Sequence, residues 1–193
     1  SFFESKGIYR EELVIMNLGT SGDKKIGIYR SQPLIDIVRT CNEHSINLYS
    51  EALGQLLLLE KSFKKGNNYP QEGDWEKLFG EYALDGEKIS LNDACGLSPK
   101  NQISTKKMTS FLTVMARKLG NDLILSALTP AGKEGSTVAA FNGKKFQNRL
   151  WLKSGSISNV LNYAGIFKSA RNDKYYAFCI FSNNREIPHI PGN

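Results

Sequence analysis

The chain has 193 residues, of which 40% are hydrophobic and 23% are charged, and its net charge at neutral pH is +6. These values are typical of an ordinary globular protein with one hydrophobic core. No apolar run approaches the roughly 18 residues of a membrane-spanning helix, and the first residues contain no apolar segment typical of a signal peptide. The basic residues are scattered among acidic ones, which argues against a nucleic-acid-binding surface.

The first half of the sequence contains mainly helical patterns. Residues 11–18 and 25–30 are strand-like and flank a turn marked by Gly and Ser. Three helices are predicted after them. Residues 32–44 repeat apolar side chains at helical spacing, residues 48–62 are dense in Ala and Leu, and residues 71–82 end before an Asp-Gly pair.

The second half changes from helix to strand. Ser104 is predicted to cap a helix that extends to Lys118, with Gly120 just beyond its end. Strand patterns then occupy residues 149–153, 159–168 and 174–182. The last two patterns, joined by a short polar loop, indicate an antiparallel hairpin. Helices followed by sequential strands predict an α+β fold, in which helices cover an antiparallel sheet.

The most informative local pattern is Lys153-Ser154-Gly155-Ser156, which follows the predicted strand 149–153. Glycine allows a ligand to approach the backbone closely, because it has no Cβ. The two hydroxyl groups can donate hydrogen bonds to a carboxylate, and lysine supplies a positive charge. The pattern therefore suggests a site for an anionic group.

A second pattern, Ser45-Ile46-Asn47, lies between the two helices predicted over 32–44 and 48–62. Ser-x-Asn and Lys-[Ser/Thr]-Gly are two of the three sequence elements of penicillin-binding proteins and serine β-lactamases. Ser-x-Asn alone carries little information, because Ser90-Leu91-Asn92 and Ser182-Asn183-Asn184 also fit it. The surroundings of Ser45, HSINLYSEAL, distinguish it from the other two.

Most of the segment 29–183 resembles the class C low-molecular-mass penicillin-binding proteins, the D-alanyl-D-alanine carboxypeptidases that also act as endopeptidases. Four stretches carry the resemblance in the family's order: YRSQPLIDIVRTCNEHSINLYSEAL, NDACGLSPKNQIS, LTPAGKEGSTV and RLWLKSGSISNVLNYAGIF. The resemblance implies the penicillin-binding fold, with the lysine element on an edge strand of the sheet. It also implies acyl transfer from a peptide ending in D-Ala-D-Ala to a serine, followed by hydrolysis.

The resemblance assigns a role to each residue of the two patterns. Ser45 would relay a proton to the leaving amine, and Asn47 would hold the substrate's backbone amide. Lys153 would support both the serine network and the terminal carboxylate electrostatically. The Ser154 and Ser156 hydroxyls would bind the terminal carboxylate, and the backbone N–H of Ser156 would donate to the oxyanion. Gly155 would let the substrate lie close to the backbone. If these roles are correct, the fold must bring Ser45 and Lys153 within hydrogen-bonding distance or one water apart.

The family's third element, the Ser-x-x-Lys nucleophile, is not found where the family has it. Three strings fit the pattern, beginning at Ser21, Ser62 and Ser104. The first lies in a turn, the second ends a helix, and the third is a predicted helix cap that follows Ser-x-Asn. We therefore expect a C-terminal part of a longer enzyme, inactive by itself, with residues 29–193 from the catalytic domain and residues 1–28 as a possible remnant of an inserted accessory domain.

Other readings stay open. Ser45 could merely cap the next helix, and residues 154–156 could form an ordinary turn at a strand end. The protein could be a non-catalytic cell-wall-binding or interaction domain with the same fold. It could also be a serine β-lactamase or an esterase with this fold. The resemblance implies peptidoglycan peptides as partners, β-lactams as inhibitors of the whole enzyme, and a periplasmic or cell-envelope location, with no cofactor.

The sequence does not favour a metal site. Cys41, Cys95 and Cys179 lack metal-ligand spacing, and His44 and His189 are the only histidines. Cys41 and Cys179 lie within apolar patterns and are predicted to be small core residues. His44 is predicted to pack near the turn before Ser45.

Overall fold

The computed structural model describes residues 30–64, 74–80 and 89–184. The strand predicted over 11–18, the strand predicted over 25–30 except for its last residue, and the string that begins at Ser21 lie outside these ranges. In the described part of the chain, no helix is both long and apolar enough to cross a bilayer.

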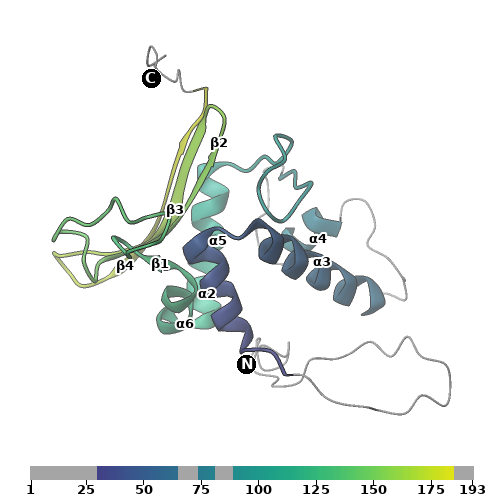
Figure 1. The fold of residues 1–193 in the computed structure, drawn as a ribbon, viewed down its shortest axis with the longest axis horizontal. Coiled ribbons are helices and arrows are strands. Elements are labelled where there is room, and N and C mark those ends of the chain that lie inside the picture. Colours follow the sequence, from purple (N-terminus) through teal and green to yellow (C-terminus); the bar gives the residue numbers. More distant parts are fainter. Residues whose placement is uncertain (1–29, 65–73, 81–88, 185–193) are drawn as a thin grey trace.

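The described chain opens with two helices joined by a short elbow (Figure 1). Helix α2 (Leu34–His44) starts after Pro33, whose fixed φ suits a helix start, and helix α3 (Asn47–Lys64) follows it. Helix α4 (Asp74–Gly80) packs against α3. Here the Trp75 ring lies so close to Gly54 that a Cβ on Gly54 would be 2.9 Å from it.

The predicted cap of the next helix is confirmed. Helix α5 (Thr105–Leu119) begins after Ser104, whose Oγ accepts a hydrogen bond from the backbone N–H of Lys107. Gly120 ends the helix with a positive φ of 81°, a conformation that glycine adopts without strain. The chain then forms helix α6 (Asn121–Ala127), which was not predicted from the sequence.

A four-stranded antiparallel sheet completes the fold. Its strands are β1 (Thr129–Pro130), β2 (Leu150–Ile157), β3 (Val160–Lys168) and β4 (Tyr175–Ser182), in the order β1-β2-β3-β4. The hairpin expected from the last two strand patterns is present. Strand β2, however, extends beyond the predicted end at residue 153, because residues 153–157 continue to pair with β3.

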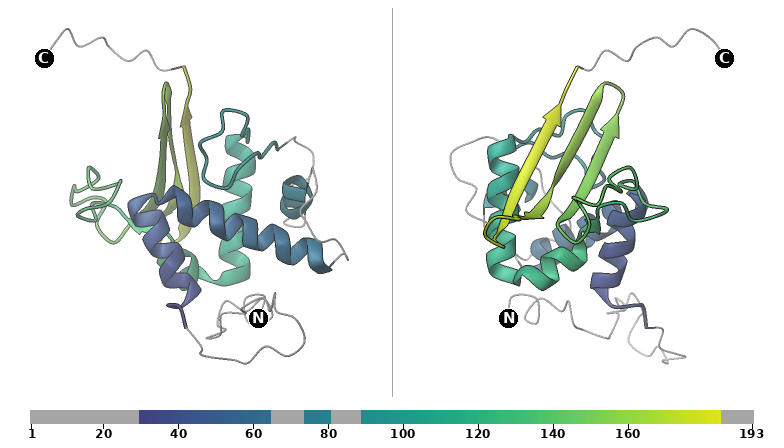
Figure 2. Two further views of the ribbon diagram at one scale, coloured as in Figure 1. Left: turned by 45° about the vertical axis from the view of Figure 1, so that its right-hand side comes forward. Right: turned by 90° about the vertical axis from the view of Figure 1, so that its left-hand side faces the viewer.

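Helices α5 and α6 lie against one face of the sheet (Figure 2). The core between these layers contains Ile124 and Leu128 from the α6 region and Ile166 from β3, with Met115 of α5 and Trp151 of β2 packed against them. This arrangement confirms the predicted α+β fold with helices covering an antiparallel sheet.

The long connection between β1 and β2, residues 131–149, lies on the opposite side of the sheet from α5 (Figure 2). Its Phe141 makes an edge-on ring contact with Tyr163 of β3, with ring centroids 5.2 Å apart. Val138 in the same connection is fully buried. We call residues 131–142 the covering loop.

Strands β2 and β3 approach closely at Gly165. A Cβ at this position would lie 2.1 Å from the carbonyl oxygen of Trp151 and 2.7 Å from the Cα of Leu152. Only glycine fits without moving the two strands apart. Because Leu152 immediately precedes Lys153, this contact helps to set the position of the lysine.

Candidate active site

Ser45 occupies the elbow between α2 and α3. It is the C-terminal cap of α2, with φ 54° and ψ 51°, and its backbone N–H donates to the carbonyl of Cys41. The next amide, that of Ile46, donates to the same carbonyl at 3.1 Å. The alternative reading of Ser45 as the cap of the following helix is therefore wrong. Its hydroxyl does not turn back onto α3 but accepts a hydrogen bond from a distant residue.

That residue is Lys153. Its Nζ donates to Ser45 Oγ at 2.9 Å and also to the carbonyl oxygen of Ser154. The fold thus brings together two residues that are 108 positions apart in the sequence, as predicted. Because opposite residues of an antiparallel pair share a face, Lys153 lies on the same sheet face as Ala164 and Ile166, towards the helices.

The environment of Lys153 changes its acidity. Burial lowers the pKa of its ammonium group, while the nearby thiol of Cys41 acts in the opposite direction. A lowered pKa brings the amine closer to releasing its proton at neutral pH. This is the property required of a lysine that takes part in proton transfer.

Cys41 is buried, as predicted, but it is also a neighbour of the site. Its Sγ donates to the carbonyl of Ile46 at 3.5 Å, within the elbow that carries Ser45. Burial raises the pKa of the thiol, although the charge of Lys153 acts against the shift. Cys41 therefore fills the space behind Ser45 as a neutral group.

The other predicted residues lie around this pair. Asn47 is the first residue of α3 and is exposed. Gly155 and Ser156 are exposed on β2, whereas Ser154 is partly buried. Residues 154–156 all pair with β3, so the alternative of an ordinary turn at the strand end is wrong.

Ser154 has a partner that sequence reasoning missed. Its Oγ donates a hydrogen bond of 2.9 Å to Thr137 Oγ1 in the covering loop. The backbone N–H of Thr137 in turn donates to the carbonyl of Glu43, near the end of α2. Thr137 lies in the LTPAGKEGSTV stretch, whose resemblance to the family indicated a relation to the site without identifying a residue.

The free edge of β2 borders the site. Strand β1 pairs only with Trp151 and Leu152, so within the described residues the stretch from Lys153 to Ile157 has a partner strand on one side only. Backbone N–H and C=O groups along such an edge are available to an extended peptide. The lysine element therefore lies on an edge strand.

A second polar cluster lies against the start of α3. Glu51 Oε2 accepts from the amide of Ala94 at 2.8 Å, and Asp93 Oδ1 accepts from the amide of Gly96 at 2.7 Å and from Asn101 Nδ2 at 2.8 Å. The ligand-type atoms of Glu51, Asp93 and Cys95 lie within 4.8 Å of one another. Backbone and side-chain donors already engage both carboxylates. We therefore interpret the cluster as a structural one, which holds residues 92–101 against α3, and not as a metal site.

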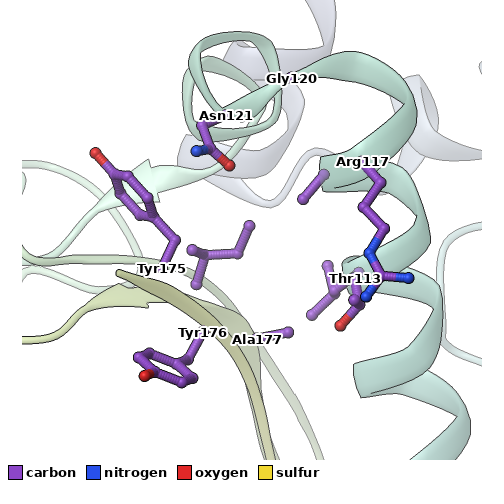
Figure 3. Close-up of a pocket in the computed structure, with 10 residues that line it drawn as sticks. Thr113, Arg117, Gly120, Asn121, Tyr175, Tyr176 and Ala177 are labelled. Atoms are coloured by element: carbon purple, nitrogen blue, oxygen red, sulfur yellow. The ribbon is translucent and has the colours of Figure 1, made fainter. Parts of the chain in front are cut away.

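A hollow of about 380 Å³ lies elsewhere, between the C-terminal part of α5 and the start of β4. Figure 3 shows Arg117 and Asn121 on one side of it and Tyr175 and Tyr176 on the other. None of the residues that line it belongs to the two sequence patterns. The candidate site is thus defined by the polar contacts around Lys153 and not by this hollow.

The serines of two of the three Ser-x-x-Lys strings, Ser62 and Ser104, lie within the described residues. Ser104 caps α5 through its hydroxyl oxygen. Ser62 is 1% exposed within α3, so a substrate carbonyl cannot reach its hydroxyl. His44, expected to pack near the elbow, is the last residue of α2 and is exposed, with its Nε2 3.8 Å from Glu43 Oε1.

Comparisons with known proteins agree with the geometry. The model of the D-Ala-D-Ala carboxypeptidase 3 (S13) family matches residues 2–190. No match was found among curated protein sequences. The structure of penicillin-binding protein 4 (dacB) from Haemophilus influenzae in complex with a β-lactam is similar, with a TM-score of 0.69 and 19% identity, over 91% of this chain and 43% of that chain.

Two further structures have the same fold. A second structure of the Haemophilus influenzae protein has a TM-score of 0.72 and 18% identity, over 91% of this chain and 39% of that chain. A predatory endopeptidase from Bdellovibrio bacteriovorus, in complex with an immunity protein, has a TM-score of 0.66 and 18% identity, over 88% of this chain and 42% of that chain. The chain therefore spans less than half the length of these structures.

Proposed function

The chain belongs to the D-Ala-D-Ala carboxypeptidase 3 (S13) family, and we propose that it is part of a serine-type carboxypeptidase and endopeptidase that acts on peptidoglycan stem peptides. One observation carries the proposal. Lys153 Nζ, whose pKa is lowered by burial, donates to Ser45 Oγ at 2.9 Å. A partly desolvated lysine beside a serine hydroxyl is an arrangement that moves protons without histidine.

In this mechanism a serine attacks the peptide carbonyl and D-alanine leaves as an amine. Ser45 passes a proton towards that amine, because its hydroxyl can both accept and donate a hydrogen bond. Lys153 provides positive charge beside this relay. Water then hydrolyses the acyl-enzyme and restores the serine.

The substrate would lie along the free edge of β2 as an extended strand. The Ser154 and Ser156 hydroxyls would bind its terminal carboxylate, and the backbone N–H of Ser156 would donate to the oxyanion. Gly155 leaves room for the peptide backbone. The exposed carboxamide of Asn47 would hold the substrate amide, since it carries both a donor and an acceptor.

The nucleophile, a Ser-x-x-Lys serine, would come from a part of the protein outside this sequence. Two observations support this. The chain spans less than half the length of the similar structures, and Leu48 and Leu56 of α3 are 75% and 59% exposed, as expected if further protein covers them. Residues 29–193 would then belong to the catalytic domain, and residues 1–28 would be the remnant of an inserted accessory domain.

With this substrate, the protein would act in the periplasm or cell envelope, where peptidoglycan lies. β-Lactams would acylate the same serine in the full-length protein. Penicillin-binding protein 4 from Haemophilus influenzae, which has the same fold, has been solved in complex with a β-lactam.

Labelled penicillin tests the proposal directly. The full-length protein should form a stoichiometric adduct on the serine of an upstream Ser-x-x-Lys motif, and the isolated chain should form none. Mass spectrometry of the intact proteins and their peptides measures both results. A full-length protein that folds but forms no adduct would favour the non-catalytic wall-binding alternative. An adduct on the isolated chain, at Ser21, Ser62 or Ser104, would place the nucleophile inside this sequence.

A further inference from the structure

Thr137 connects the two parts of the candidate site. Its hydroxyl oxygen accepts from Ser154 of β2, and its backbone N–H donates to Glu43 of α2 at 3.2 Å. Glu43 precedes Ser45 by two positions and lies 3.8 Å from the ammonium of Lys133, through its Oε1. The covering loop is therefore attached both to the elbow that carries Ser45 and to the strand that carries Lys153.

The covering loop holds Thr137 in place. Val138, the next residue, is fully buried, and its carbonyl accepts from the amide of Gly132 at 3.1 Å across the loop. Gly132 has a positive φ of 74°, and a Cβ there would come within 2.8 Å of the Asn142 Cα. These contacts fix the backbone on both sides of Thr137, although its own side chain is exposed.

Ser154 and Thr137 together have one hydroxyl proton that is not used in their mutual hydrogen bond. Two hydroxyl groups carry two protons, and the single hydrogen bond between Ser154 and Thr137 uses one of them. No other hydrogen bond is made by the Thr137 hydroxyl within the described residues. When Ser154 donates to a carboxylate, its oxygen can accept the proton of Thr137, and such a chain strengthens the outer bond.

We infer that Thr137 is a positioning residue, which fixes the Ser154 hydroxyl and reinforces its hydrogen bond to the free C-terminal carboxylate of the substrate. The inference rests on the proposed function, because it takes Ser154 as the carboxylate-binding group. Through Thr137, the covering loop would help the site to distinguish peptides with a free C-terminal carboxylate from amidated peptides and from peptide bonds within a chain.

The test uses the full-length protein and two peptides that end in D-Ala-D-Ala, one with a free carboxylate and one amidated. Thr137→Val keeps the shape and removes the hydroxyl. It should lower kcat/KM for the free peptide by about fivefold, the ratio expected for one net hydrogen bond. The kcat/KM for the amidated peptide should be unchanged. Thr137→Ser should restore the wild-type ratio of kcat/KM between the free and the amidated peptide.

A double variant tests whether Thr137 acts through Ser154. In the Ser154→Ala background, Thr137→Val should cause no further loss, because the group that it positions is gone. Ser136→Ala is the matched control in the same loop. Its hydroxyl donates to the Lys133 carbonyl at 2.6 Å, so its removal should lower the melting temperature without changing the ratio between the two peptides.

Three different results would contradict the inference, and each points to a different explanation. Equal loss on both peptides in Thr137→Val would make Thr137 structural. A further loss in the Ser154→Ala background would mean that Thr137 contacts the substrate itself. A wild-type protein that hydrolyses neither peptide would overturn the proposed function, and this inference with it.

Discussion

The structure contains two polar clusters near the start of α3, and they differ in how many of their donors and acceptors are already hydrogen-bonded. One lies around Lys153 and contacts Ser45 in the elbow before α3, and the other lies around Asp93 and contacts Glu51 of α3. Around Asp93, the carboxylate accepts from Gly96, Ser98 and Asn101. Around Lys153, the ammonium contacts one hydroxyl and one carbonyl, and the exposed hydroxyls nearby keep protons to donate.

This difference separates a structural cluster from a candidate for chemistry. A carboxylate whose oxygens are occupied by backbone donors stabilises a loop and has little left with which to bind a ligand. A partly desolvated lysine beside exposed hydroxyls has unused capacity and an altered pKa, which are frequent at active sites. The comparison makes different predictions for changes in the two clusters.

The largest effect is expected for Lys153→Ala in the full-length protein. The change removes the positive charge that contacts Ser45 and that, in the proposed function, supports binding of the substrate carboxylate. Penicillin acylation should slow by about 10²–10³, the size of effect seen when one preorganised electrostatic contact is removed from an active site. Stopped-flow or quench measurement of the acylation rate constant checks this. A loss of less than about fivefold would remove Lys153 from the proposed mechanism.

Asp93→Ala should instead reduce stability. The variant leaves two backbone amides and Asn101 without their acceptor, which should cost about 2 kcal/mol in the free energy of unfolding. Urea denaturation of the isolated chain measures it. The acylation rate constant of folded full-length protein should change far less than in Lys153→Ala, and a comparable change would bring the Asp93 cluster into the active site.

The Asp93 cluster also predicts a response to acid. Burial by itself would raise the pKa of Asp93, but hydrogen bonds from Asn101, Gly96 and Ser98 outweigh it and lower the pKa below 3.8. The carboxylate therefore contributes stability above pH 3.8, and this contribution is lost as the pH falls further. Asp93→Ala should lack this part of the acid dependence, so the difference in stability between the two chains should shrink below pH 3.8.

The Lys153 cluster should respond to base, and there too folding stability should rise with pH. Because the pKa of Lys153 is lowered from 10.5, the unfolded chain binds its proton more readily than the folded chain between the lowered pKa and 10.5. Folding stability should therefore rise with pH across this window. Lys153→Met lacks the titrating group, so the stability of the wild type relative to this variant should increase from pH 7 to pH 10.5. A constant difference would contradict the lowered pKa.

The smallest effect is expected for Ser154→Thr, which keeps the hydroxyl that faces Thr137. Hydrolysis of the free and amidated peptides should stay within about twofold of the wild type. Ser154→Val has the branched shape of the threonine variant but no hydroxyl, and it should weaken only the reaction of the free peptide. If Ser154→Val slows both peptides equally, Ser154 has a structural role and does not bind the carboxylate.

The parts of the fold that the sequence revealed are those specified by local patterns. The Ser104 cap and the following Gly120 identified α5, and two strand patterns joined by a short polar loop identified the β3–β4 hairpin. Helix α6 and strand β1 were missed, because seven residues and two residues are too short to show a period. The end of β2 was missed because glycine and serine have low strand propensity, and pairing with β3 overrides it.

The candidate site shows the same division. The hydrogen bond between Ser45 and Lys153 was predicted because both patterns resemble those of one family. The contacts of Thr137 and Cys41 with this site could not be predicted, since each depends on how a loop or helix end is folded against β2. Thr137 and its partner Ser154 lie in different stretches of the sequence, and so do Cys41 and its neighbour Lys153.

The left-handed backbone of Ser45 has a consequence for evolution. A residue with a Cβ is disfavoured in this conformation by about 1–2 kcal/mol, whereas glycine adopts it freely and is the commonest residue at such helix ends. A descendant of this protein that no longer needed the hydroxyl would gain stability by acquiring glycine at position 45. Among related sequences, glycine at this elbow should therefore mark lineages that have lost the proposed activity and kept the fold.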